Sequence, residues 1–219
     1  MGVTQQESGP SARAAVALTV IAAAAFAAVF RFQRLGPLDF FSAFALAAAV
    51  AAGLSLAVDS GYARRLGRDL GSGPVGKAAA GLASAAVLYA VFAAGRALSR
   101  PLLPFAAAGI ARVYALKSGL PAGRVVLLIG LVIGPAEELF WRGFVQERMA
   151  ARAGRTAAWL FASLLYAAVH LSSGNAMLVL AAAVCGLFWG GLYARFRSPV
   201  LNAASHTAWD LLVFVLFPL

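Results

Sequence analysis

The sequence predicts an all-α fold, a polytopic bundle of transmembrane helices, from three observations. Hydrophobic residues make up 62% of the 219 residues and charged residues only 12%, whereas soluble domains are nearer half apolar. The mean hydropathy is +0.84. Apolar runs also recur along the whole chain, and most approach the ~20 residues that cross a bilayer as a helix. We therefore expect an integral membrane protein that folds as one compact bundle.

About seven apolar runs are predicted to cross the membrane. They cover residues 14–30, 39–58, 78–95, 122–145, 157–171, 175–194 and 199–218. Segment 101–121 is different, because its apolar run is short and is followed by Arg112 and Lys117. We expect an interfacial or re-entrant helix in this segment, with an eighth span as the alternative.

The net charge of +10 lies mainly between the apolar runs, where lysine and arginine orient helices and meet anionic lipid. No basic face interleaved with aromatic residues occurs, so nucleic acid is not an expected partner. With seven spans, basic loops 59–77, 146–155 and 195–198 share one side, whereas loop 96–121 adds basic residues on the other. The positive-inside rule favours a cytoplasmic N-terminus. The alanine- and arginine-rich composition suggests a bacterial cytoplasmic (inner) membrane.

Few ionisable side chains lie within the predicted spans, apart from Asp39 at the start of the second. A charged group near the centre of a membrane helix costs about 2.5–3.5 kcal/mol on insertion scales, so such residues usually serve a function. The chain has two histidines, and both are among these residues. The candidate site residues are Glu137, Glu138, Arg142, His170, His206 and Asp210.

Glu137 and Glu138 are adjacent but have different expected environments. Glu138 precedes Arg142 by four residues, so the two can pair on one helix face. Glu137 lies about 100° around the helix and lacks that partner. Counted from a turn near Ala153, Glu137 is 16 residues before it and His170 is 17 after it. An antiparallel hairpin therefore places Glu137 and His170 at one height.

The last span adds a polar stripe at a similar depth. His206 lies seven residues past Pro199, about 10 Å into the membrane at ~1.5 Å per residue. Asn202 and Asp210 are each four residues from His206 and point the same way. The residues expected to meet at one level, roughly 10–15 Å below the cytoplasmic side, are Glu137, His170, His206 and Asp210.

Two chemistries fit these four residues. In the first, Glu137 and His170 hold and deprotonate a water that attacks a peptide carbonyl, while His206 and Asp210 steady the oxyanion. This mechanism requires no cofactor. In the second, a divalent metal such as Zn²⁺ activates the water, although no HExxH motif is present. The ligands that Zn²⁺ could use are His170, His206, Glu137 and Asp210.

Three short motifs resemble those of a known family. EELFWR (137–142) is similar to the EExxxR motif of the CPBP intramembrane proteases, the family of type II CAAX prenyl endopeptidases and bacteriocin-processing enzymes also called Abi. YAAVH (166–170) resembles its FxxxH motif, with Tyr166 in place of phenylalanine. HTAWD (206–210) resembles HxxxN or HxxxD. The motifs follow the family's order, and the resemblance covers about residues 122–214.

The resemblance implies a helical bundle with a water-filled cavity open to the cytoplasm, and an endopeptidase often labelled a metalloprotease. Glu137 resembles the catalytic base, His170 shares the water, and Arg142 orients the glutamate pair. His206 and Asp210 occupy the positions beside the oxyanion. Asp210 departs from the asparagine form of the motif, because an ionised aspartate cannot donate a hydrogen bond. It would be protonated, orient His206 or bind metal.

The chain then divides into a cytoplasmic tail (1–13), N-terminal transmembrane helices with the interfacial segment (14–121), and a CPBP-like catalytic core (122–219). The expected function is intramembrane endopeptidase activity on a membrane-associated protein or peptide, with the prenylation of that substrate left open. One alternative is a proton- or ion-coupled transporter that uses the Glu/His/Asp cluster. The other is a membrane scaffold without catalytic activity.

Overall fold

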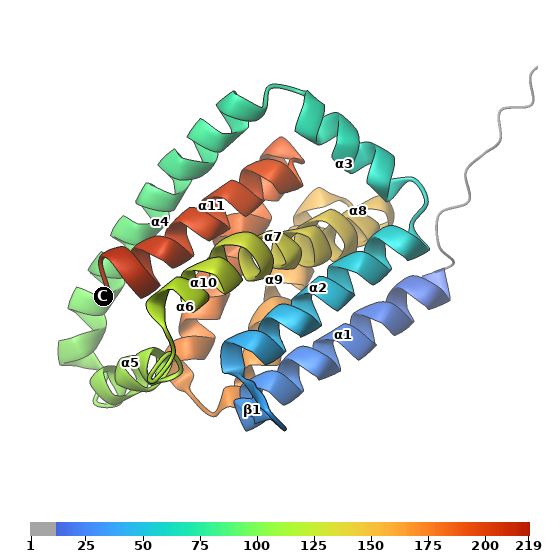
Figure 1. Cartoon of the computed structure of the whole chain (residues 1–219). Coiled ribbons are helices and arrows are strands. Elements are labelled where there is room, and N and C mark those ends of the chain that lie inside the picture. Colours follow the sequence, from blue (N-terminus) through green and yellow to red (C-terminus); the bar gives the residue numbers. More distant parts are fainter. Residues whose placement is uncertain (1–11) are drawn as a thin grey trace, which may run out of the picture.

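The structure is a computed structural model that describes residues 12–219, and it confirms the all-α prediction (Figure 1). Most of the predicted tail, 1–13, lies outside the described residues. A short antiparallel hairpin pairs β1 (Arg34–Leu35) with β2 (Leu38–Asp39). The helices are α1 (Ala12–Phe32), α2 (Phe40–Val58), α3 (Tyr62–Gly71), α4 (Pro74–Leu102), α5 (Ala106–Ala115), α6 (Ala122–Leu127), η1 (Leu128–Ile133), α7 (Gly134–Glu137), η2 (Glu138–Gln146), α8 (Glu147–Ala153), α9 (Arg155–Val169), η3 (His170–Ser173), α10 (Ala176–Phe196), α11 (Pro199–Leu211) and η4 (Leu212–Leu216).

Six helical stretches among the described residues are long and apolar enough to cross a membrane, so the chain is an integral membrane protein. They are α1, α2, α4, α9 with η3, α10, and α11 with η4. The predicted span 122–145 is the exception. The chain stays helical from α6 to α8, but α-helical turns alternate with the wider π-helical turns of η1 and η2. The span is therefore not one regular helix.

The segment predicted as interfacial or re-entrant, 101–121, contains the end of α4 and the short helix α5. At ten residues, α5 is about 15 Å long, which is half of the ~30 Å hydrocarbon thickness. Helix α5 is therefore too short to form an eighth span by itself. The predicted loop 59–77 also contains a helix, α3, which crosses one end of the bundle between α2 and α4 (Figure 1).

Polar side chains define where several spans begin. The Asp39 carboxylate accepts a hydrogen bond from the Ser42 amide at 3.1 Å, at the start of α2. Asn175 caps α10 in the same way. Ser198 caps α11, whose first residue is Pro199. Such caps satisfy amides that have no partner within the helix, and proline is tolerated at the first helical position.

The run from α6 to α8 passes through the middle of the bundle (Figure 1). Helices α1 and α2 lie on one side of it, α4 and α11 on the other, and α9 and α10 behind it in this view. The run contacts α2, α9, α10 and α11 directly. The η2 part of the run is buried among these helices, which allows it to carry charged residues away from lipid, whereas Leu131 of η1 is 72% exposed.

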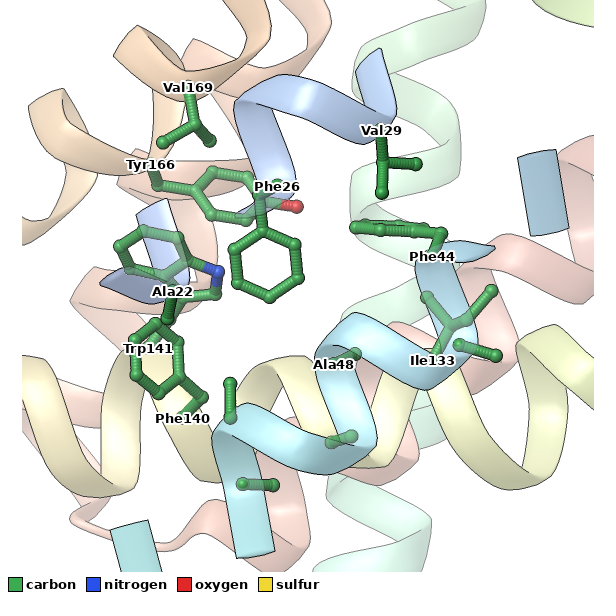
Figure 2. Packing of buried hydrophobic residues seen from close by; sticks show 14 of the residues in the cluster. Ala22, Phe26, Val29, Phe44, Ala48, Ile133, Phe140, Trp141, Tyr166 and Val169 are labelled. Carbon is green, nitrogen blue, oxygen red and sulfur yellow. The ribbon is translucent and has the colours of Figure 1, made fainter. Parts of the chain in front are cut away.

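An aromatic core joins α1 and α2 to the central run (Figure 2). Phe26 of α1 packs edge-on against Phe44 of α2, with ring centroids 5.5 Å apart. Phe26 also lies 5.7 Å from Trp141 of η2, and Trp141 meets Tyr166 of α9 at 5.6 Å. Edge-to-face and tilted contacts of this kind are favourable aromatic geometries. They fix η2 against α1 and α9, and α1 against α2.

Both ends of the bundle are basic, which weakens the predicted orientation. The end that holds α3 and α8 carries Arg13, Arg64, Arg65, Arg68, Lys77, Arg148, Arg152, Arg155, Arg195 and Arg197. The end that holds α5 carries Arg31, Arg34, Arg96, Arg100, Arg112, Lys117 and Arg124. Because the positive-inside rule depends on a difference between the two sides, it favours a cytoplasmic N-terminus only by a small margin.

Candidate active site

Glu138 is fully buried and is held by three groups from two helices. Its side chain is 0% exposed. Arg142 Nη1 lies 3.2 Å from Glu138 Oε1, which is the predicted pair four residues apart. His206 Nδ1 lies 2.8 Å from the same oxygen, and Asn202 Nδ2 donates to Glu138 Oε2 at 3.0 Å. A buried carboxylate is tolerated when it is paired and hydrogen-bonded in this way.

Arg142 is also enclosed by aromatic rings. Its guanidinium carbon lies 4.7 Å from the centre of the Tyr166 ring and 5.8 Å from that of Trp189. No hydrogen-bond partner is found within residues 12–219 for either terminal nitrogen of Arg142. The contact with Glu138 is therefore a charge pair, supplemented by cation–π contacts, and the group holds η2 against α9 and α10.

His206 links the buried Glu138 to the other carboxyl groups. Its ring stacks on Trp189 of α10, with centroids 3.7 Å apart. Because an ionised carboxylate only accepts hydrogen bonds, Nδ1 donates to Glu138. The other nitrogen, Nε2, lies 3.6 Å from Asp210 Oδ2 and 3.9 Å from Glu137 Oε2. Glu137 and Asp210 thus approach the same edge of the imidazole.

His170 lies at the junction of α9 and η3. Its Nδ1 is 2.8 Å from the backbone oxygen of Tyr166. Because a carbonyl oxygen can only accept, Nδ1 carries the hydrogen, and a neutral ring then has its lone pair on Nε2. The ring packs on Phe30 of α1 at 4.2 Å and on Tyr166 at 4.9 Å. The local contacts therefore fix both the tautomer and the orientation of the ring.

A cavity of about 380 Å³ joins these groups, and its lining is mainly apolar. Glu137, His170, His206 and Asp210 all contribute to the lining, whereas Glu138 and Arg142 do not. The structure therefore brings together the four residues that the sequence places at one level. It also separates the two glutamates, because one faces the cavity and the other is buried behind it.

The cavity lies in the half of the bundle that ends at α5. Most of its lining comes from the parts of the helices nearest that end, for example Phe40 at the start of α2 and Ser99 near the end of α4. The start of α1 lies at the opposite end (Figure 1). With a cytoplasmic N-terminus, the cavity would therefore lie in the half of the membrane away from the cytoplasm, whereas the resemblance implies a cavity open to the cytoplasm.

The cavity reaches the surface between α4 and α10, which contact each other. Val91 of α4 is 45% exposed and Leu180 of α10 is 48% exposed, and both line the cavity. Gly95 of α4 is also exposed and lines it. Because α4 and α10 are long and apolar enough to cross a membrane, a gap between them would face lipid.

The grouping of the side chains gives no support to the metal alternative. Within residues 12–219, no three histidine, cysteine, aspartate or glutamate side chains are grouped so that they could hold a metal ion. His206 uses Nδ1 for Glu138, and His170 uses Nδ1 for a backbone carbonyl. Each imidazole therefore retains one nitrogen, Nε2, that these two contacts do not use.

Three residues of the site escaped prediction as functional residues. Trp189 supports the His206 ring and accepts a hydrogen bond from Asn202 through its backbone oxygen. Asn202 belongs to the polar stripe of the last span, and that spacing was the available signal. Trp209 lines the cavity, and in the described part of the chain its buried indole N–H has no hydrogen-bond partner. A tryptophan in an apolar helix gives no such signal.

Comparison with known proteins agrees with the motifs. The family model described as type II CAAX prenyl endopeptidase, Rce1-like, matches residues 120–212, close to the 122–214 over which the motifs resemble that family. All six candidate residues lie in the matched segment. No curated protein matches the chain, and no solved structure matches it. The family implies a CAAX-type intramembrane protease with a membrane-embedded protein substrate. The chain is therefore an integral membrane protein whose residues 120–212 match the model of the Rce1-like type II CAAX prenyl endopeptidase family.

Proposed function

We propose that the chain is an endopeptidase that hydrolyses a peptide bond inside the cavity with a water activated by Glu137 and His170. The observation that carries this proposal is the separation of the two glutamates. Glu138 is occupied by Arg142, His206 and Asn202, whereas Glu137 lines the cavity. A general base must be able to reach the proton that it removes, and Glu137 is the glutamate with that access.

In the proposed reaction, a water lies between the Glu137 carboxylate and Nε2 of His170. Glu137 removes one proton, and the oxygen attacks the carbonyl carbon of the substrate to form a tetrahedral intermediate. The proton held by Glu137 then passes to the leaving nitrogen, and the C–N bond breaks. General acid–base catalysis of this kind contributes about 10²- to 10⁴-fold to the rate.

The oxyanion of the intermediate is proposed to face His206. Since Nδ1 donates to Glu138, a ring with hydrogen on both nitrogens presents Nε2–H to the cavity. Asp210 lies 3.6 Å from Nε2, which supports a role in orienting His206 rather than in donating to the oxyanion. The indole N–H of Trp209, which has no hydrogen-bond partner among residues 12–219, is a second donor at this wall. Donors aimed at developing charge are a major source of catalysis.

The proposed substrate is a membrane-associated protein or peptide, and the proposed location is the bacterial cytoplasmic membrane. The apolar lining of the cavity suits an apolar segment, and the gap between α4 and α10 would admit it from the bilayer. A mechanism that uses only Glu137, His170 and water needs no metal, so chelators are expected to leave activity unchanged.

The proposal is tested by mapping the N- and C-termini of membrane proteins by mass spectrometry in cells that express either the wild type or Glu137→Gln at matched levels. Termini present only with the wild type would identify both the substrate and the scissile bond. If the two proteins are equally abundant and folded and give identical termini, the peptidase proposal fails for that host's proteins. Ion flux through proteoliposomes would then test the transporter alternative.

A further inference from the structure

Helix α3 lies outside the matched family segment, yet it contacts both of the helices that carry the carboxylates and His206. It crosses the end of the bundle opposite α5 (Figure 1). Its first residue, Tyr62, reaches the central run at η2. Near its other end, Asp69 reaches the start of α11. The rest of α3 is rich in arginine and largely exposed.

Tyr62 is inserted into the π-helical segment that begins at Glu138. Its side chain is 1% exposed, and its hydroxyl donates to the backbone oxygen of Leu139 at 2.7 Å. The insertion depends on Gly143. A Cβ atom at that position would lie 1.8 Å from the Tyr62 hydroxyl oxygen and 2.7 Å from the ring carbon that bears it. Position 143 therefore has to lack a side chain for Tyr62 to reach Leu139.

Tyr62 is itself fixed by charged groups at the end of α2. Asp59 accepts from Arg65 at 2.6 Å and from the Gly61 amide at 3.1 Å, and it also pairs with Arg148 of α8. Arg65 lies over the Tyr62 ring, 5.4 Å from its centre. These contacts join the end of α2, the start of α3 and the end of the central run, so the ring position is set on three sides.

Asp69 holds the start of α11. Its Oδ2 accepts from the Ser198 hydroxyl at 2.9 Å and from the Val200 amide at 3.0 Å. Its Oδ1 pairs with Lys77 at 2.6 Å. A carboxylate at a helix N-terminus satisfies amides that lack partners and favours the helix dipole. His206 lies two turns further along the same helix.

We propose that α3 is a brace that sets how far the two glutamates of the central run, Glu137 and Glu138, lie from His206 of α11. Tyr62 and Asp69 are the positioning residues of this brace. The catalytic consequence rests on the proposed peptidase function, but the brace itself does not. Displacement of a reacting group by about 1 Å can cost about 100-fold in rate, so a hydrogen bond to the residue after Glu138 can influence catalysis without touching substrate.

The first test compares Tyr62→Phe and Asp69→Ala with Tyr193→Phe. The control also removes a buried hydroxyl, which donates to Glu147 at 3.0 Å on the surface side of α8. For the wild-type substrate, we expect Tyr62→Phe and Asp69→Ala to lower kcat roughly 10- to 100-fold with KM unchanged, and the control to stay near the wild type. A loss that appears in KM alone, or equally in the control, would overturn the positioning role.

A second readout needs no activity. Amide hydrogen exchange over residues 134–145 in detergent should accelerate in Tyr62→Phe and remain unchanged in Tyr193→Phe, whose contact lies outside this range at Glu147. If the wild type cleaves no substrate but exchange accelerates as expected, the peptidase proposal fails and the brace survives. If the wild type is active while both exchange and kcat of Tyr62→Phe match the wild type, the brace is refuted.

The close approach of Tyr62 to Gly143 allows a suppression test. Gly143→Ala should impair the protein because its methyl group would overlap Tyr62. Every atom that a Cβ at position 143 would meet within 3.0 Å belongs to the Tyr62 side chain. Adding Gly143→Ala to Tyr62→Ala should then cost little more than Tyr62→Ala alone. Fully additive losses in kcat and in hydrogen-exchange protection would show that the two positions act independently, and would contradict the proposed fit.

Discussion

Glu138 and His206 are joined by a hydrogen bond of 2.8 Å between the central helical run and α11. The bond occupies Nδ1 of the imidazole and directs Nε2 toward Glu137 and Asp210. The bond also occupies Oε1 of Glu138, the same carboxylate oxygen that pairs with Arg142. Two adjacent glutamates in one membrane helix therefore occupy different positions, since Glu138 links helices in the dry interior and Glu137 faces the cavity.

The first prediction concerns this link. Glu138→Ala should lower the free energy of unfolding by about 3–5 kcal/mol, because breaking a buried pair leaves Arg142 uncompensated. Thermal unfolding of the detergent-solubilised protein measures the effect. Glu147→Ala is the matched control, since its ion pair with Arg197 is partly exposed and such pairs contribute about 0–1 kcal/mol. Equal losses in the two variants would contradict the structural role of Glu138.

The second prediction concerns the gap between α4 and α10. Gly95 lines the cavity and has open space around it, so Gly95→Trp should fold and obstruct the gap. We expect kcat/KM for a membrane-embedded substrate to fall about tenfold, or ~1.4 kcal/mol, with a smaller loss for a short soluble peptide. Gly76→Trp on the same helix, also in open space, is the control. Equal effects on both substrates would argue against access from lipid.

The third prediction is a pH dependence at Asp59, which follows the last residue of α2. Burial would raise the pKa of this carboxyl, but hydrogen bonds and charges from Arg65 and Arg148 outweigh it and hold the pKa below its ordinary value of 3.8. A lowered pKa stabilises the folded state above the unfolded pKa, and the contribution is lost as pH falls through the folded pKa. The stability difference between wild type and Asp59→Asn should therefore be constant near neutrality and shrink below about pH 4. Unfolding in detergent at pH 7 and pH 3 measures it, and a difference that persists or widens in acid would refute the assignment.

The fourth prediction concerns orientation. The slightly more basic α3 end favours a cytoplasmic N-terminus, and the structure places Leu219 at the opposite end of the bundle (Figure 1). Alkaline phosphatase fused after Leu219 should then be active, because this enzyme folds outside the cytoplasm, and green fluorescent protein fused there should be dark. The reverse pattern would show that the cavity faces the cytoplasm and that the charge-based orientation is wrong.

Much of the site could be predicted because helical periodicity is regular. Glu138 and Arg142 pair as their spacing indicates, and Glu137, His170, His206 and Asp210 line one cavity, as residue counts along the hairpins suggest. These predictions needed only the rise per residue and the cost of charge in lipid.

Other features depend on contacts between distant segments. The π-helical turns of η2 have no local sequence signal, and they replace the regular span predicted at 122–145. The fit of Tyr62 against Gly143 joins residues far apart in sequence. The half of the bundle in which the cavity lies depends on how the helices are offset along the bundle axis, and the hydropathy of the sequence carries no information about that offset. The charge of each bundle end likewise depends on which end each short loop occupies in the folded chain.

The most direct test of the account is the activity of purified Glu137→Gln in liposomes, measured on the wild-type substrate beside Glu147→Gln. Glu137→Gln keeps the size of the side chain but removes the base, so we expect kcat to fall at least about 100-fold with unchanged thermal stability. Glu147→Gln removes a partly buried carboxylate that does not line the cavity, and it should keep wild-type activity. Full cleavage by Glu137→Gln would contradict the assignment of Glu137 as the base that activates water.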